Sequence, residues 1–145
     1  MLHRLKYLPF AAAIAMAGGC AATSDSAKPN ASLTNTYWKL TQLDGAPVAM
    51  APQQEREVRI TLTNDGKVTG FTGCNRVMGG YTVAGTALRF TQLAGTRMAC
   101  PPPLMQLESA VLANLNSVTG YQLEGEKLIL LKDGAPVARF ESVYL

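Results

Sequence analysis

Residues 57–75 read EVRITLTNDGKVTGFTGCN, and this stretch decides the fold. Its first half alternates apolar and polar residues, as a strand does when one face of an antiparallel sheet is buried. The Asn-Asp-Gly triplet at 64–66 tolerates positive φ angles and predicts a tight hairpin turn. Residues 67–75 then predict the returning strand, in which Gly70 and Gly73 indicate bulges or a sharp bend.

Strand patterns bounded by turn signals continue on both sides of this hairpin. We expect further strands at 37–43, 81–83, 88–93, 120–123, 127–132 and 137–143. One segment differs, because 104–116 follows three prolines and has helix spacing. Its apolar stripe consists of Leu104, Leu107, Val111 and Leu115. The sequence therefore predicts an α+β fold that is mostly β, with one helix.

Two short motifs occur twice. The run Asp-Gly-Ala-Pro-Val-Ala at 44–49 recurs at 133–138, and Tyr-x-(Val/Leu)-x-Gly-x-x-Leu at 81–88 recurs at 121–128. A duplication or a repeated binding loop would explain them. We favour hairpins that reuse the same turn chemistry, because the surrounding residues do not match.

The first nineteen residues have the layout of an export signal. Two basic residues precede an apolar, uncharged run of a length too short to span a bilayer. Ala17, Gly18 and Gly19 then precede Cys20, which resembles a lipobox, although leucine is more usual than Ala17. We predict a signal peptide at 1–19 and a lipid-modified Cys20, acylated with chains such as palmitate. The alternative is a plain secreted protein cleaved nearby.

Residues 20–32 are small and polar, and predict a flexible tether before a domain at 33–145. Ala21 stands where inner-membrane lipoproteins carry Asp, so we expect a periplasm-facing outer-membrane location. Without the signal, 11 basic residues face 10 acidic ones and no basic run remains, which argues against nucleic-acid binding. The single histidine, His3, leaves with the signal, which removes histidine-based catalysis and metal ligation.

Lipidation of Cys20 would leave Cys74 and Cys100 as a possible pair. In an oxidising compartment a structural disulfide is our favoured reading, ahead of two buried free thiols. A redox role is the third reading, because the spacing is not Cys-x-x-Cys although Arg76 and Arg97 lie near.

We expect no metal, no cofactor and no enzyme activity. The methionines are soft ligands for copper, but they are scattered and more often fill gaps in a core. Glu108 is the best candidate for a partly buried acid and could accept a backbone N–H or pair with Arg97. Trp38 is expected to anchor the core, with ligand stacking as the alternative, and Asn75 to satisfy nearby backbone groups.

The chain contains the motifs Gly73-Cys74-Asn75, Gly80-Tyr81 and Thr96-Arg97-Met98-Ala99-Cys100, together with Trp38 and Glu108. Taken together, these motifs resemble the META/HslJ family of small bacterial envelope proteins. The resemblance covers residues 33–145 and implies a strongly bent antiparallel sheet, a half-barrel, with one helix packed across it. It implies no enzyme activity and a loose link to heat or envelope stress.

We therefore expect a monomeric, non-enzymatic lipoprotein that is held at the membrane by its lipid and binds another envelope protein. A carrier of a small apolar ligand or lipid is the alternative. An open apolar cavity would favour the carrier, whereas a filled core with an exposed apolar patch would favour protein binding.

Overall fold

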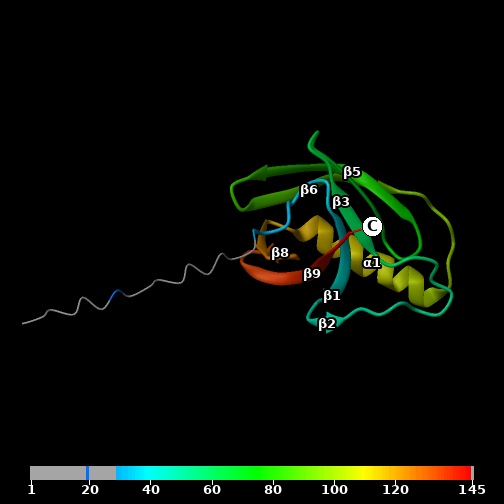
Figure 1. Cartoon of the computed structure of the whole chain (residues 1–145). Coiled ribbons are helices and arrows are strands. Elements are labelled where there is room, and N and C mark those ends of the chain that lie inside the picture. The colour runs from blue at the N-terminus through cyan, green and yellow to red at the C-terminus, as the bar shows by residue number, and fades with distance from the viewer. Residues whose placement is uncertain (1–18, 20–28, 145) are drawn as a thin grey trace, which may run out of the picture.

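The computed structural model describes residue 19 and residues 29–144. It contains nine strands and one helix within this part of the chain (Figure 1). The strands are β1 (Tyr37–Leu43), β2 (Ala46–Pro47), β3 (Arg59–Leu62), β4 (Lys67–Phe71), β5 (Arg76–Ala84), β6 (Ala87–Gly95), β7 (Gly120–Glu124), β8 (Lys127–Lys132) and β9 (Ala135–Val143), and the helix is α1 (Pro102–Ser117). The predicted signal peptide except residue 19, Cys20 and most of the tether lie outside the described residues.

All strands form one antiparallel sheet in the order β2-β1-β3-β4-β5-β6-β7-β8-β9. β1 also pairs with β9, so the sheet curves until its last strand meets β1, the second strand in the order. Figure 1 shows α1 lying across the strongly bent sheet. The predicted fold class, mostly β with a bent antiparallel sheet and one helix, is confirmed. No helix among the described residues is long and apolar enough to cross a membrane.

The hairpin predicted around residues 64–66 is present. In β3 and β4 the apolar side chains of Ile60, Leu62 and Val68 are buried, and the polar positions between them face outward. Gly66 has φ of 80°, which glycine adopts without strain, and the Thr63 amide closes the turn by donating to the Lys67 carbonyl at 2.8 Å.

The predicted single strand over 67–75 is wrong in its second half. β4 ends at Phe71, residues 72–75 reverse the chain, and β5 begins at Arg76. The Thr72 amide donates to the Asn75 carbonyl at 3.0 Å and closes this turn. The strand expected at 81–83 is the end of the much longer β5.

Gly70 marks a close approach of two backbones rather than a bulge. It pairs in regular register with Ile60 on one side and Val77 on the other. A Cβ added at Gly70 would lie 2.3 Å from the Arg59 carbonyl oxygen. The register shifts later, between Met78 and Gly80.

The helix fills the concave side of the sheet. Its sixteen residues extend the predicted 104–116 segment slightly at both ends, and the prolines before Leu104 occupy the first turn. Leu104, Val111 and Leu115 are buried, and the last two join the main core. Trp38 is fully buried in that core and its indole N–H donates to the Leu33 carbonyl at 3.0 Å. Trp38 is therefore a core anchor with no surface on which a ligand could stack.

The two copies of the Asp-Gly-Ala-Pro-Val-Ala motif form turns of the same kind. Asp44-Gly45 has φ angles of 50° and 80°, and Asp133-Gly134 has 48° and 82°. Each pair joins two adjacent antiparallel strands, β1 to β2 and β8 to β9. Shared turn chemistry accounts for the repeat.

Candidate functional site

Three segments that are far apart in sequence meet at one end of the sheet. They are the turn at 72–75, the irregular segment at 96–100 before the helix, and the second turn of α1. A disulfide between Cys74 and Cys100 joins the first two, with 6.0 Å between the Cα atoms. The bridge favoured from sequence is therefore present, and it ties the β4–β5 turn to the segment that enters the helix.

Asn75 lies at the centre of this junction and is buried. Its Oδ1 accepts hydrogen bonds from the Met98 amide at 2.8 Å and the Thr96 hydroxyl at 3.1 Å. Its Nδ2 donates to the Met98 carbonyl at 3.2 Å and to Glu108 Oε2 at 3.1 Å. One side chain thus satisfies both backbone groups of Met98, which an irregular segment cannot satisfy by itself.

Glu108 connects the helix to the turn. Its Oε1 accepts a hydrogen bond from the Thr72 hydroxyl at 2.5 Å, and its Oε2 accepts the bond from Asn75. Its partners are side chains, neither a backbone N–H nor Arg97. Within residues 29–144 the one ion pair joins Lys67 to Asp65, on the surface. Glu108 therefore acts as a fixed acceptor for two buried donors.

Thr72 was not among the candidates from sequence, although it is 1% exposed and donates to Glu108. A threonine before a glycine is too common for its sequence position to reveal this contact. Gly73 was a candidate, and its φ of 107° suits glycine. A Cβ at Gly73 would lie 2.9 Å from Leu107 Cδ2, so glycine lets the helix pack against the turn.

Not every motif residue reaches this junction. Gly73, Cys74, Asn75, Thr96, Met98, Cys100 and Glu108 gather there, whereas Trp38, Gly80 and Tyr81 do not. The Tyr81 hydroxyl donates to the Thr63 carbonyl at 2.5 Å and steadies the β3–β4 hairpin. Burial, with a smaller contribution from the Asp65 charge, raises the pKa of Tyr81. Arg97 is exposed.

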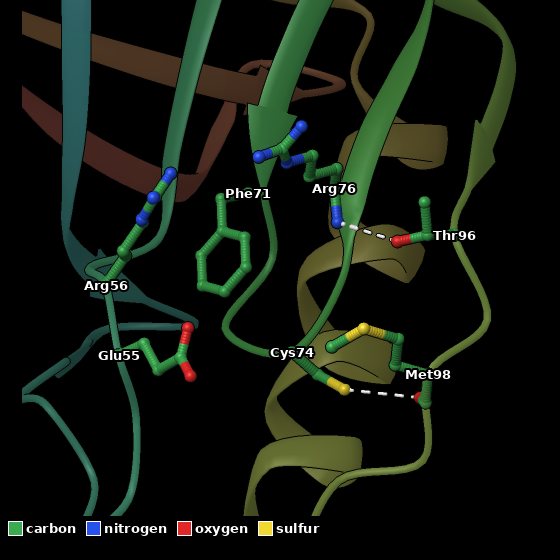
Figure 2. A pocket seen from close by; sticks show the side chains of 7 residues that line it. All are labelled: Glu55, Arg56, Phe71, Cys74, Arg76, Thr96 and Met98. Atoms are coloured by element: carbon green, nitrogen blue, oxygen red, sulfur yellow. Dashed lines mark hydrogen bonds between the residues drawn. The ribbon is translucent and has the colours of Figure 1, made fainter.

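Beside the junction lies an open pocket with a volume of about 330 Å³. Figure 2 shows its lining, in which Arg56 and Arg76 stand on either side of the Phe71 ring. Glu55, Cys74, Thr96 and Met98 complete the lining. Cys74 Sγ lies 3.4 Å from the Met98 carbonyl oxygen, but a disulfide sulfur has no proton to donate, so this is a packing contact.

The groups of the junction that could carry covalent chemistry are already engaged. Both cysteines of the junction are oxidised, and the Glu108 carboxylate is occupied by two donors. Across the part of the chain that the structure describes, no three His, Cys, Asp or Glu side chains are grouped so that they could hold a metal ion.

The family of this chain is shown by its match to a family model. The model of the META domain matches residues 31–144, which is most of the chain. The chain belongs to the META domain family. In this META domain the matched range contains every strand, the helix and the disulfide. No curated protein matches it.

Three solved structures resemble this META domain. An NMR structure of a protein from Burkholderia xenovorans has 29% identity and a TM-score of 0.62, covering 97% of this chain and 100% of that one. A second NMR structure has 23% identity and a TM-score of 0.60, covering 75% and 90%. The crystal structure of a DUF4847 family protein from Bacteroides vulgatus has 17% identity and a TM-score of 0.56, covering 75% and 93%. The last two similarities show the fold alone.

Proposed function

We propose that this META domain is a non-enzymatic binding module of the bacterial envelope, anchored to the outer membrane through a lipid on Cys20. Its partner is another envelope protein, and its role belongs to the response to envelope stress. The signal layout before Cys20 and the family resemblance support the location and the role. The choice between protein binding and carriage of a lipid rests on how the inside of the sheet is filled.

The concave side of the sheet holds side chains and leaves little room for a ligand. Trp38, Leu128, Phe140, Val111 and Leu115 are each at most 2% exposed and belong to one packed core. A carrier of an apolar ligand needs a pre-formed apolar cavity. The pockets beside the junction are instead open to solvent and lined partly by charged side chains. This packing favours protein binding over carriage.

The outer face beside the junction has the composition of a protein interface. Met78 and Met98 are each 62% exposed. The pocket lined by Met98 and the neighbouring pocket lined by Met78 share Arg56 and Arg76. Exposed methionine, aromatic and arginine side chains are the types enriched where proteins bind one another. We call Phe71, Met78, Met98, Arg56 and Arg76 the junction face.

Site-specific crosslinking in intact cells tests the proposal. A photo-reactive amino acid replaces Met98 in one variant and Thr82, an exposed residue of the β5–β6 hairpin, in the control. We expect a discrete protein adduct from position 98 that is absent from position 82. Adducts with lipid alone would favour the carrier, and the same adducts from both positions would refute the junction face as the binding surface.

A further inference from the structure

The outward side chains of three neighbouring strands are arranged in two rows. Arg59, Phe71 and Arg76 occupy paired positions on β3, β4 and β5. Thr61, Thr69 and Met78 occupy the next paired positions on the same face. Adjacent strands lie about 4.8 Å apart, so the arginines at the two ends of the first row can both reach a group bound above β4.

Every residue of these two rows except Phe71 lines a hollow with a volume of about 420 Å³, which we call the arginine hollow. Arg56, Arg59 and Arg76 line it together with Thr61 and Thr69, and its lining includes no acidic residue. None of the three arginines forms an ion pair with a carboxylate of residues 29–144. Three arginines and two threonines thus line one open space.

The Arg59 guanidinium is held by a neighbouring ring, and one of its N–H donors has no acceptor. Its guanidinium carbon lies 5.1 Å from the centre of the Tyr37 ring, which holds the group in place. Its Nε is buried and meets no hydrogen-bond acceptor among the described residues. A buried donor without an acceptor is energetically costly, which leaves the Arg59 guanidinium under-satisfied by the protein's own groups.

The carboxylate that comes closest to Arg59 in sequence is already engaged elsewhere. Glu57 Oε1 accepts a hydrogen bond from the Tyr37 hydroxyl at 2.7 Å. That hydrogen bond, together with the nearby positive charges of Lys39 and Arg59, holds the pKa of Glu57 below its usual range. Glu57 therefore stays ionised near Arg59 without supplying the acceptor that the buried Nε lacks.

We propose that the arginine hollow is a binding site for a phosphate group, carried by a lipid headgroup or by a soluble phosphate ester. Arg59 offers the terminal N–H groups of its guanidinium as a fork that matches two phosphate oxygens. Arg56 and Arg76 supply further charge, and Thr61 and Thr69 can donate hydroxyl protons. The half-buried Phe71 and the exposed Met78 offer apolar surface to whatever carries the phosphate. This site goes beyond the proposed function, although both use Arg56 and Arg76.

Nuclear magnetic resonance of the full chain in a non-ionic detergent tests the site. Inorganic phosphate, soluble dihexanoylphosphatidylglycerol and dihexanoylphosphatidylcholine are titrated separately at constant ionic strength. We expect saturable shifts of the Arg59 Nε–H and of the Thr61 and Thr69 amides with at least one of the first two probes. The probe that binds more tightly identifies the source of the phosphate, and the zwitterionic phosphatidylcholine should bind more weakly than phosphatidylglycerol.

Variants separate a built site from general attraction by charge. Arg59→Gln, and also Arg59→Lys, which keeps the charge but loses the fork, should weaken binding about tenfold, read from the threonine amides. Arg89→Gln, which removes an exposed arginine of β6, should change nothing. No saturable shift with phosphate or phosphatidylglycerol, or equal weakening by Arg59→Gln and Arg89→Gln, would overturn the proposal. Crosslinking at position 98 is unaffected by that outcome, so the two proposals can fail separately.

Discussion

Asn75 fills all four hydrogen-bonding positions of its side-chain amide. Two donors reach its oxygen, and its nitrogen reaches the Met98 carbonyl and the Glu108 carboxylate. Because every hydrogen-bonding position of its side chain is used, Asn75 holds the three segments of the buried junction in one arrangement. From sequence Asn75 was expected only to satisfy nearby backbone groups, and its full role depends on partners that only the fold supplies.

Replacing Asn75 with alanine should lower the free energy of unfolding by about 1–3 kcal/mol, because the Met98 backbone and Glu108 lose their partner. Urea unfolding followed by tryptophan fluorescence measures the loss. Asn114→Ala is the control, since Asn114 bonds to Asp44 on the exposed side of the helix. Its cost should stay within about 0.5 kcal/mol. Equal losses for the two variants would contradict the role assigned to Asn75.

Glu57 makes the stability sensitive to acid. Its pKa in the folded chain lies below the ordinary value of 4.5, chiefly because the Tyr37 hydroxyl donates to the carboxylate. The stabilisation is therefore fully present above about pH 4.5 and is lost as the pH falls through the lower folded pKa. In Tyr37→Phe we expect the pKa of Glu57 to rise toward its usual value. A pH titration that follows the Glu57 carboxyl carbon by nuclear magnetic resonance measures the change. Tyr144→Phe, at an exposed tyrosine, should leave the Glu57 pKa unchanged.

Among the elements, the turn at 72–75 was the least predictable from sequence. Gly73 was interpreted as a bulge or a sharp bend because 67–75 was predicted to be one returning strand. The turn is fixed by Glu108 and Cys100, which lie far along the chain, so no local pattern reveals it. The hairpin at 64–66 was predictable, because its Asn-Asp-Gly triplet dictates the conformation locally.

The disulfide joins that turn to the start of the helix. Removing it in Cys74→Ala/Cys100→Ala should lower the free energy of unfolding by about 3.5 kcal/mol, because the chain-entropy model assigns that value to a loop of this length. The protein should still fold, since the main core lies apart from the bridge. Chemical denaturation measures the difference. A change smaller than that of Asn75→Ala would mean that the hydrogen bonds alone hold the junction.

Strands β3 and β4 approach each other too closely for any side chain at Gly70. In Gly70→Ala the new Cβ meets the backbone of Arg59, which cannot rotate away as a side chain can. We expect a loss of about 3 kcal/mol and a lower melting temperature by calorimetry. Thr82→Ala, at an exposed position of β5, is the strand control and should cost little. If Gly70→Ala melted like the control, the tight contact would be relaxed in solution.

For the whole molecule, the fold class followed from sequence because alternation, turn residues and one helix-spaced segment agreed with one another. Cys74, Cys100, Asn75 and Glu108 were identified from the residues themselves, whereas Thr96 and Met98 entered as site residues through the family resemblance. The arginine hollow was missed entirely. Arg59 and Arg76 lie on different strands and Arg56 lies before β3, so their common face depends on the pairing register.

Membrane attachment is the property of the whole chain that the proposal for its function needs most. Replacing Cys20 with serine should release the domain from membranes or leave the precursor uncleaved, because serine offers no thiol for acylation. Cell fractionation and labelling with a fatty acid measure the outcome. Cys74→Ala is the control and should remain attached. A labelled fatty acid that persists on the Cys20→Ser protein would show that the anchor lies elsewhere.

The pairing of β1 with β9 governs when the protein can fold. Tyr37 lies opposite Val143, so the sheet is complete only after its last strand is available. Contacts between such distant segments form slowly, because a long loop must close first. If the chain is exported from its N-terminus onward, as proposed above, it therefore stays unfolded during passage and acquires its stable structure once its final residues arrive.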